Sequence, residues 1–156
     1  ADGSLLLDAR QLGGSAATRQ TMLSRDGGAT WEAPVHGLPM APVMSSLARL
    51  AATRDGDAGN LLVHSGVSAT GRVDLTVWAS TDEAASWTGA TVLFPGFAQY
   101  SQPVALGPCS FGVIFESAGR PDDAAPGAVT RFNIRFARVD VGALFPDAAP
   151  WCTAAR

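Results

Sequence analysis

Residues 24–31, Ser-Arg-Asp-Gly-Gly-Ala-Thr-Trp, and residues 80–87, Ser-Thr-Asp-Glu-Ala-Ala-Ser-Trp, are two copies of the pattern Ser-x-Asp-x-Gly-x-Thr-Trp. In the first copy, the Ser and Asp oxygens can accept hydrogen bonds from nearby backbone N–H groups. The glycines supply positive φ, and the Trp folds back as an apolar plug. The pattern predicts a self-contained hairpin turn, which is a scaffold element and carries no catalytic group.

The second copy makes the pattern an internal repeat. Its serine, aspartate and tryptophan follow those of the first copy at an offset of 56 (80 − 24), and Ala84 stands where the first copy has Gly28. Units of short strands and polar turns that recur at this spacing, each with a Trp-bearing hairpin, are typical of a β-propeller. A solenoid or a sandwich fits the repeat less well.

Short apolar runs separated by polar turns fill most of the chain and are predicted as strands. The runs on either side of the polar turn at residues 53–59 are expected to form a hairpin. The predicted strands cover about residues 3–10, 19–24, 44–50, 60–65, 72–79, 101–106, 111–116 and 131–141.

Alternation within these runs predicts which residues share a face. Every second residue from Val73 to Ala79 is apolar, as in a strand with one buried face. In the last predicted strand, Phe132, Ile134 and Phe136 are expected to face a core, with polar residues between them facing away.

The length limits how much of a propeller the chain can build. Propellers have about 4 to 8 blades of four strands, and 156 residues supply only about three blades. We therefore expect an all-β fold that is the C-terminal half of a six-bladed β-propeller, with residues 1–143 in the propeller and 144–156 as a tail. The other half is expected from another chain or a cleaved segment, because an open ring leaves sheet faces uncovered.

Composition excludes several classes of protein. With 47% hydrophobic and 16% charged residues, the chain is globular and not disordered. A net charge of −3, without a run of basic residues, argues against binding nucleic acid. No apolar run reaches the roughly 18 residues that span a bilayer, and no signal peptide begins the sequence, although one could have been removed. A secreted or lysosomal, luminal location is favoured, with the compartment left open.

The cysteines and histidines do not form a metal-binding or triad pattern. Cys109 and Cys152 permit one disulfide, and we leave the paired and the free states equally open. His36 and His64 are isolated in the sequence from any serine, aspartate or ligand spacing. We expect neither a metal nor another cofactor.

The stretch from Phe97 to Glu116 carries the candidate chemistry. Tyr100 is the only tyrosine in the chain and lies at the head of one apolar strand, while Glu116 ends the next. A carboxylate at the end of so apolar a strand must find a partner or shift its pKa. The competing interpretation is that Tyr100 is a half-buried packing aromatic and Glu116 a solvated strand end.

The repeat and three further stretches together resemble a known family. The repeated pattern is the one called the Asp box. Combined in this order with DGSLLLDAR (residues 2–10), GRVDLTVWASTDEAASW (71–87) and AQYSQPVALGPCSFGVIFES (98–117), it resembles the C-terminal half of exo-α-sialidases, or neuraminidases, of the bacterial and animal type. The resemblance covers roughly residues 1–141 and implies a six-bladed propeller with its active site on the central axis.

The resemblance implies roles for four residues. Arg10 and Arg72 match the second and third of three arginines that bind the substrate carboxylate. Tyr100, in a Tyr-Ser pair, matches the nucleophile, and Glu116 matches a glutamate that orients the first arginine. The first arginine, the acid/base aspartate and the glutamate that activates the tyrosine lie earlier in the family's order, and none of them is in this chain.

The implied activity is hydrolysis of terminal sialic acids from glycoconjugates by a retaining mechanism. Planar guanidinium groups suit the sialic acid carboxylate, and every one of the 11 basic residues here is an arginine. Two alternatives stay open: a non-catalytic propeller that binds sialic acid or another carbohydrate, and an Asp-box interaction module. Tyr100 separates the enzyme from the binder, since a binder needs no nucleophile.

Overall fold

The computed structural model describes residues 3–11, 18–118 and 132–152, and these residues form an all-β fold. Apart from the strands it has one short helix, α1 (Val141–Leu144), and 3-10 turns at Thr53–Asp55 and Pro150–Cys152. The strands are β1 (Leu5–Arg10), β2 (Thr18–Ser24), β3 (Val35–Pro39), β4 (Ser46–Ala51), β5 (Leu61–Gly66), β6 (Val73–Ser80), β7 (Thr88–Gly107), β8 (Ser110–Ala118) and β9 (Phe132–Asp140).

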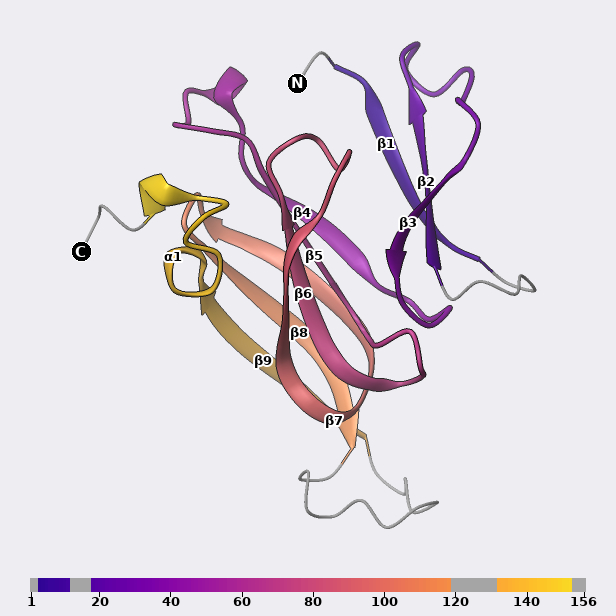
Figure 1. Cartoon of the computed structure of the whole chain (residues 1–156), viewed down its shortest axis with the longest axis vertical. Helices are drawn as coiled ribbons and strands as arrows, with labels where there is room; N and C mark the ends of the chain where they lie inside the picture. The colour runs from indigo at the N-terminus through magenta and orange to yellow at the C-terminus, as the bar shows by residue number, and fades with distance from the viewer. Residues whose placement is uncertain (1–2, 12–17, 119–131, 153–156) are drawn as a thin grey trace.

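The strands form a three-stranded sheet, β1-β2-β3, beside a curled six-stranded sheet, β4 to β9, in sequence order (Figure 1). All neighbouring strands are antiparallel. The long strand β7 divides the larger sheet in two, because residues 88–97 pair with β6 and residues 98–107 pair with β8. Three blade-like units result, which confirms the prediction of a partial β-propeller.

The two octapeptide turns are built alike. In the first, Ser24 Oγ donates to Asp26 Oδ1 at 2.8 Å and accepts from the Gly28 N–H at 2.8 Å. In the second, Ser80 Oγ donates to Asp82 Oδ1 at 2.8 Å and accepts from the Ala84 N–H at 2.9 Å. One turn joins β2 to β3 and the other joins β6 to β7, so each connects two neighbouring antiparallel strands.

The main core lies between the middle and last units. Side chains of β5 and β6, including Val63 and Val77, pack there against Phe111 and Val113 of β8. The last six residues of β6 and all of β5 are buried on both faces, because the middle unit lies between the other two. The alternation in β6, which is typical of a strand with one buried face, therefore understates its burial: Trp78 on the other face packs with Leu38 and Met40 in a second cluster.

The sequence did not predict three features of the strands. Residues 35–39 form β3, although they lack a clear apolar alternation. The Pro-Gly pair at residues 95–96 is a typical turn signal, yet it lies within β7, where Gly96 takes a φ of 86° and the register with β6 is irregular. A turn signal acts locally. Here it is outweighed by the hydrogen bonds between β7 and β6, which are made both before and after residues 95–96.

The third difference concerns the face of β9. Phe132, Ile134 and Phe136 are 55%, 65% and 60% exposed, so the expectation that they face a core was wrong. Alternation is present, but in the described residues no further sheet covers this side of the last unit. Val139 is buried on the core side. We call the uncovered side the open face; its exposed apolar side chains are Val104, Leu106, Ile114, Phe132, Ile134 and Phe136.

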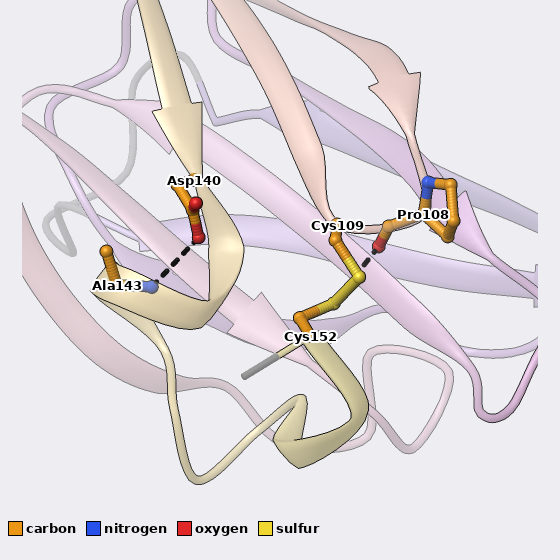
Figure 2. Close-up of a disulfide and its surroundings, with 5 residues drawn as sticks. All are labelled: Pro108, Cys109, Asp140, Ala143 and Cys152. Carbon is orange, nitrogen blue, oxygen red and sulfur yellow. Dashed lines mark hydrogen bonds between the residues drawn. A yellow bond between two sulfur atoms is a disulfide. The ribbon is translucent and has the colours of Figure 1, made fainter. Parts of the chain in front are cut away.

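The segment after β9 folds back on the strands. Phe145 and Ala149 are buried in the main core, and the Phe145 ring occupies the space where a side chain at Gly89 would lie. Cys152 forms a disulfide with Cys109, with the two Cα atoms 5.3 Å apart (Figure 2). The bond ties residues 141–152 to the start of β8. No helix in the described residues is long and apolar enough to cross a membrane.

Backbone strain in the second octapeptide turn generates a stability prediction. Ala84 has a φ of 69°, a conformation that disfavours a non-glycine residue by about 1–2 kcal/mol. Glycine also destabilises the folded state by roughly 0.5–1 kcal/mol, because it gives the unfolded chain more conformational freedom. The strain that is relieved exceeds this cost. Ala84→Gly should therefore raise the free energy of unfolding in urea by about 0.5 kcal/mol.

The first turn supplies the reciprocal control. Gly28 has a φ of 97°, and a Cβ there would meet only Leu5 Cδ1 at 3.5 Å and Trp31 Cζ2 at 3.9 Å, which are ordinary contacts. Gly28→Ala should therefore lower the free energy of unfolding through backbone strain and not through a clash. A destabilised Ala84→Gly protein would contradict this account of the turns.

Candidate functional site

Three of the four residues singled out by the sequence lie together. Arg10 at the end of β1 and Tyr100 in β7 line one open hollow, and the guanidinium carbon of Arg72 lies 5.4 Å from the centre of the Tyr100 ring. Arg72 immediately precedes β6. Each of the three blade-like units thus contributes to this group, which we call the Tyr100 cluster: Arg10, Arg72 and Tyr100.

A β-bulge presents Tyr100 to the hollow. Ser117 pairs with Ala98 and Phe115 pairs with Ser101, so two residues of β7, Gln99 and Tyr100, oppose the single residue between those partners on β8. A bulge of this kind redirects the side chains of the longer strand. Gln99 is buried, and its Oε1 accepts a hydrogen bond from Arg72 Nη1.

The residue opposite the bulge is Glu116. It lies on the same side of β8 as Ile114, which belongs to the open face, and it pairs with Ile134 of β9. It does not line the hollow with Tyr100. No cation in the described parts of the chain lies within ion-pair distance of its carboxylate.

A buried ionic group next to the hollow was not predicted from the sequence. Arg19 of β2 donates from Nη2 to Asp8 Oδ2 at 2.7 Å, and from Nη1 to the carbonyl oxygen of Val43 at 3.2 Å. His64 Nε2 lies 2.8 Å from the same Asp8 oxygen. His64 is isolated in the sequence but not in space, because its partner Asp8 lies 56 residues earlier, beyond any local pattern.

The partners of Asp8 determine its charge. Burial alone raises the pKa of Asp8, but the hydrogen bonds with His64 and Arg19 and the positive charge of Arg19 outweigh burial and lower it below the usual 3.8. Asp8 is therefore ionised at neutral pH and neutralises Arg19. This arrangement is a bidentate ion pair with a histidine donor, and not a nucleophile with its base, so it does not form a hydrolase triad.

The charge left at the hollow is positive. Among the described residues, Arg10 has no acidic partner and Arg72 bonds to the neutral amide of Gln99. No described residue hydrogen-bonds to the Tyr100 hydroxyl. The Tyr100 cluster therefore offers two guanidinium groups and one free phenol, a combination suited to a small organic anion.

A cluster of metal-ligating side chains is absent from the described part of the chain. No group of three or more His, Cys, Asp or Glu residues there could hold a metal ion. The side chain of His36 lies outside what the structure describes.

Comparison with known proteins gives structural neighbours only. No family model and no curated protein sequence matches the chain. Among solved structures, it is similar to the Hadza microbial sialidase Hz136, with a TM-score of 0.68 and 27% identity. That match covers 91% of this chain and 26% of the sialidase, so the chain spans well under half of that protein.

A second neighbour is more distant. The catalytic domain of a Coprinopsis cinerea GH62 α-L-arabinofuranosidase matches with a TM-score of 0.52 and 13% identity, over 85% of this chain and 50% of that one. At this identity the likeness shows the fold alone. Both neighbours are glycoside hydrolases, and the chain has a sialidase-like or, more broadly, glycosidase-like fold.

The lowered pKa of Asp8 generates a prediction for acid unfolding. Because the folded pKa lies below the unfolded value near 3.8, ionised Asp8 stabilises the fold fully above that value, and this stabilisation is lost as the pH falls from there through the lower folded pKa. Asp8→Asn should lower the free energy of unfolding by about 3 kcal/mol at pH 7, because it leaves the Arg19 charge buried without its partner. At pH 3 the difference from the parent should be smaller.

Urea unfolding of both proteins at pH 7 and pH 3 measures the two differences. Asp55→Asn is the control, since Asp55 is exposed and its nearest arginine nitrogen lies 3.6 Å away, and it should alter stability little at either pH. An equal effect of Asp8→Asn at both pH values would contradict the assigned charge of Asp8.

Proposed function

We propose that this chain forms part of an exo-α-sialidase, in which Arg10 and Arg72 bind the carboxylate of a terminal sialic acid and Tyr100 is the nucleophile. The observation that carries the proposal is the Tyr100 cluster itself: two arginines without acidic partners beside a phenol that has no structural hydrogen bond among the described residues. The similarity to a microbial sialidase supports the choice of substrate.

The chemistry of the substrate explains these residue types. Sialic acid carries a carboxylate on its anomeric carbon, so a carboxylate nucleophile would be repelled there. A tyrosine is neutral until a base takes its proton, and it can form a covalent glycosyl intermediate without that repulsion. The arginines hold the carboxylate while the sugar ring flattens toward an oxocarbenium-like state.

The proposal requires groups that this chain does not supply. A base for Tyr100, an acid for the leaving group and a first arginine would come from the other half of the ring, as a separate chain or as a cleaved segment. Glu116 supports this part of the proposal, because its carboxylate has no cationic partner among the described residues, lies beside the apolar open face and suits a cation brought by that half. The Cys109–Cys152 disulfide supports a secreted or luminal location.

A test of the nucleophile uses Tyr100→Phe in the protein with its ring complete. The change removes one oxygen that makes no hydrogen bond to the described residues, so the thermal midpoint should stay nearly constant. Turnover of a fluorogenic α-sialoside should fall by about a thousandfold or more. If Tyr100→Phe kept full turnover, the nucleophile assignment would be wrong. If the parent bound sialic acid but released no fluorophore, the protein would be a carbohydrate-binding propeller.

The arginines are tested in the same assay. Arg10→Lys and Arg72→Lys keep the charge but lose the planar fork, so each should weaken sialic acid binding and lower kcat/KM by about tenfold or more. Arg54→Lys is the matched control, because Arg54 is exposed and its ion pair with Asp55 is long, at 3.6 Å. Equal activity of all three variants would contradict the carboxylate-binding role.

A further inference from the structure

We infer that His64 and Ser65, two neighbours on β5, are positioning residues that fix the distance between Arg10 and Tyr100. The inference rests on the proposed function and adds residues to it that no sequence motif indicates. Successive side chains of a strand point to opposite faces. His64 therefore faces β1, the strand of Arg10, and Ser65 faces β7, the strand of Tyr100. Two neighbouring residues of one buried strand thus contact both of these strands.

The contact on the first side runs through Asp8. His64 Nε2 lies 2.8 Å from Asp8 Oδ2, and Asp8 precedes Arg10 on β1 by two positions, so both side chains lie on one face of the strand. Asp8 also holds Arg19, which donates to the carbonyl oxygen of Val43. Met44 and Ser45 follow Val43 and line the hollow with Arg10 and Tyr100.

The contact on the second side is a hydrogen bond between two serines. Ser65 Oγ donates to Ser101 Oγ at 2.9 Å, and both residues are buried, at 0% and 1% exposure. Ser101 follows Tyr100 directly and is the first residue of β7 to pair with β8 after the bulge. The bond therefore fixes the end of the bulge that presents Tyr100.

The packing around His64 keeps it in place. Its side chain is 1% exposed, and its ring makes edge contacts with Trp78 and Trp87, with centroids 6.2 Å and 5.6 Å apart. Buried Nδ1 has no hydrogen-bond partner among the residues that the structure describes, so a proton there would be an unpaired buried donor. In the neutral tautomer with its proton on Nε2, that nitrogen donates to Asp8 and Nδ1 carries no proton. His64 is then a rigid donor to Asp8 and not an acid or base of the reaction.

The two contacts should affect different kinetic constants. Loss of the His64 donor displaces the strand of Arg10, which binds substrate, whereas loss of the Ser65 hydroxyl displaces Tyr100, which reacts. Displacement of a reacting group by about 1 Å can change a rate by up to about a hundredfold. We expect His64→Leu to raise KM for the α-sialoside about tenfold, and Ser65→Ala to lower kcat about tenfold with a smaller change in KM.

Two further variants show whether these effects go beyond stability. His64→Gln retains an N–H donor that can reach Asp8, and its KM should stay within about threefold of the parent. Ser80→Ala is the control: Ser80 is equally buried, makes two hydrogen bonds in the octapeptide turn and is no part of the hollow. It should lower the thermal midpoint without changing kcat or KM once the protein is folded.

The experiment measures kcat, KM, sialic acid affinity and thermal midpoint for each variant in the ring-complete protein. The inference is wrong if His64→Leu and Ser65→Ala change only the midpoint, as Ser80→Ala does. Ser65→Ala removes a single oxygen, so an unaltered kcat in that variant decides the matter even if His64→Leu does not fold. A parent that neither turns over the sialoside nor binds sialic acid would instead overturn the proposed function, and the inference with it.

Discussion

Strand β7 belongs to two units at once, and the geometry of the molecule depends on this. Residues 88–97 complete the middle unit and residues 98–107 begin the last one without a break in the chain. The larger sheet must curl where the strand changes partner, which encloses the core between β5, β6 and β8. The bulge at Gln99 and Tyr100 lies directly after the change of partner. The same constraint that curves the sheet therefore brings the phenol into the hollow between the units.

The sequence predicted the parts of the fold that local chemistry determines. The serine and aspartate of each octapeptide make the predicted hydrogen bonds, even where Ala84 must adopt positive φ in place of glycine. Most strand positions followed from short apolar runs, but β3 and the first half of β7 did not. The sequence could not show which face of a strand is covered. Alternation distinguishes the two faces of β9, but only the neighbouring sheets determine that Phe136 is exposed and Val139 is buried.

For the candidate site, the sequence predicted the residues but not their surroundings. Arg10, Arg72 and Tyr100 were singled out by a resemblance, and the structure brings them together. Their environment could not be read from the chain. The bulge depends on the register with β8, and the Asp8–His64 contact joins residues 56 positions apart. Because Asp8 neutralises Arg19 and leaves Arg10 and Arg72 without acidic partners in the described residues, the hollow keeps the positive charge that an anionic sugar requires.

The proposed role of Tyr100 is attack on the anomeric carbon of a sialoside. The most direct measurement uses a sialyl fluoride with a second fluorine beside the anomeric carbon, which slows release of the covalent intermediate by destabilising the oxocarbenium-like state. After incubation with the ring-complete protein and proteolysis, mass spectrometry should find the sugar on the peptide that contains Tyr100, attached through the phenolic oxygen. Attachment to another residue, or no adduct in a protein that hydrolyses sialosides, would contradict the account.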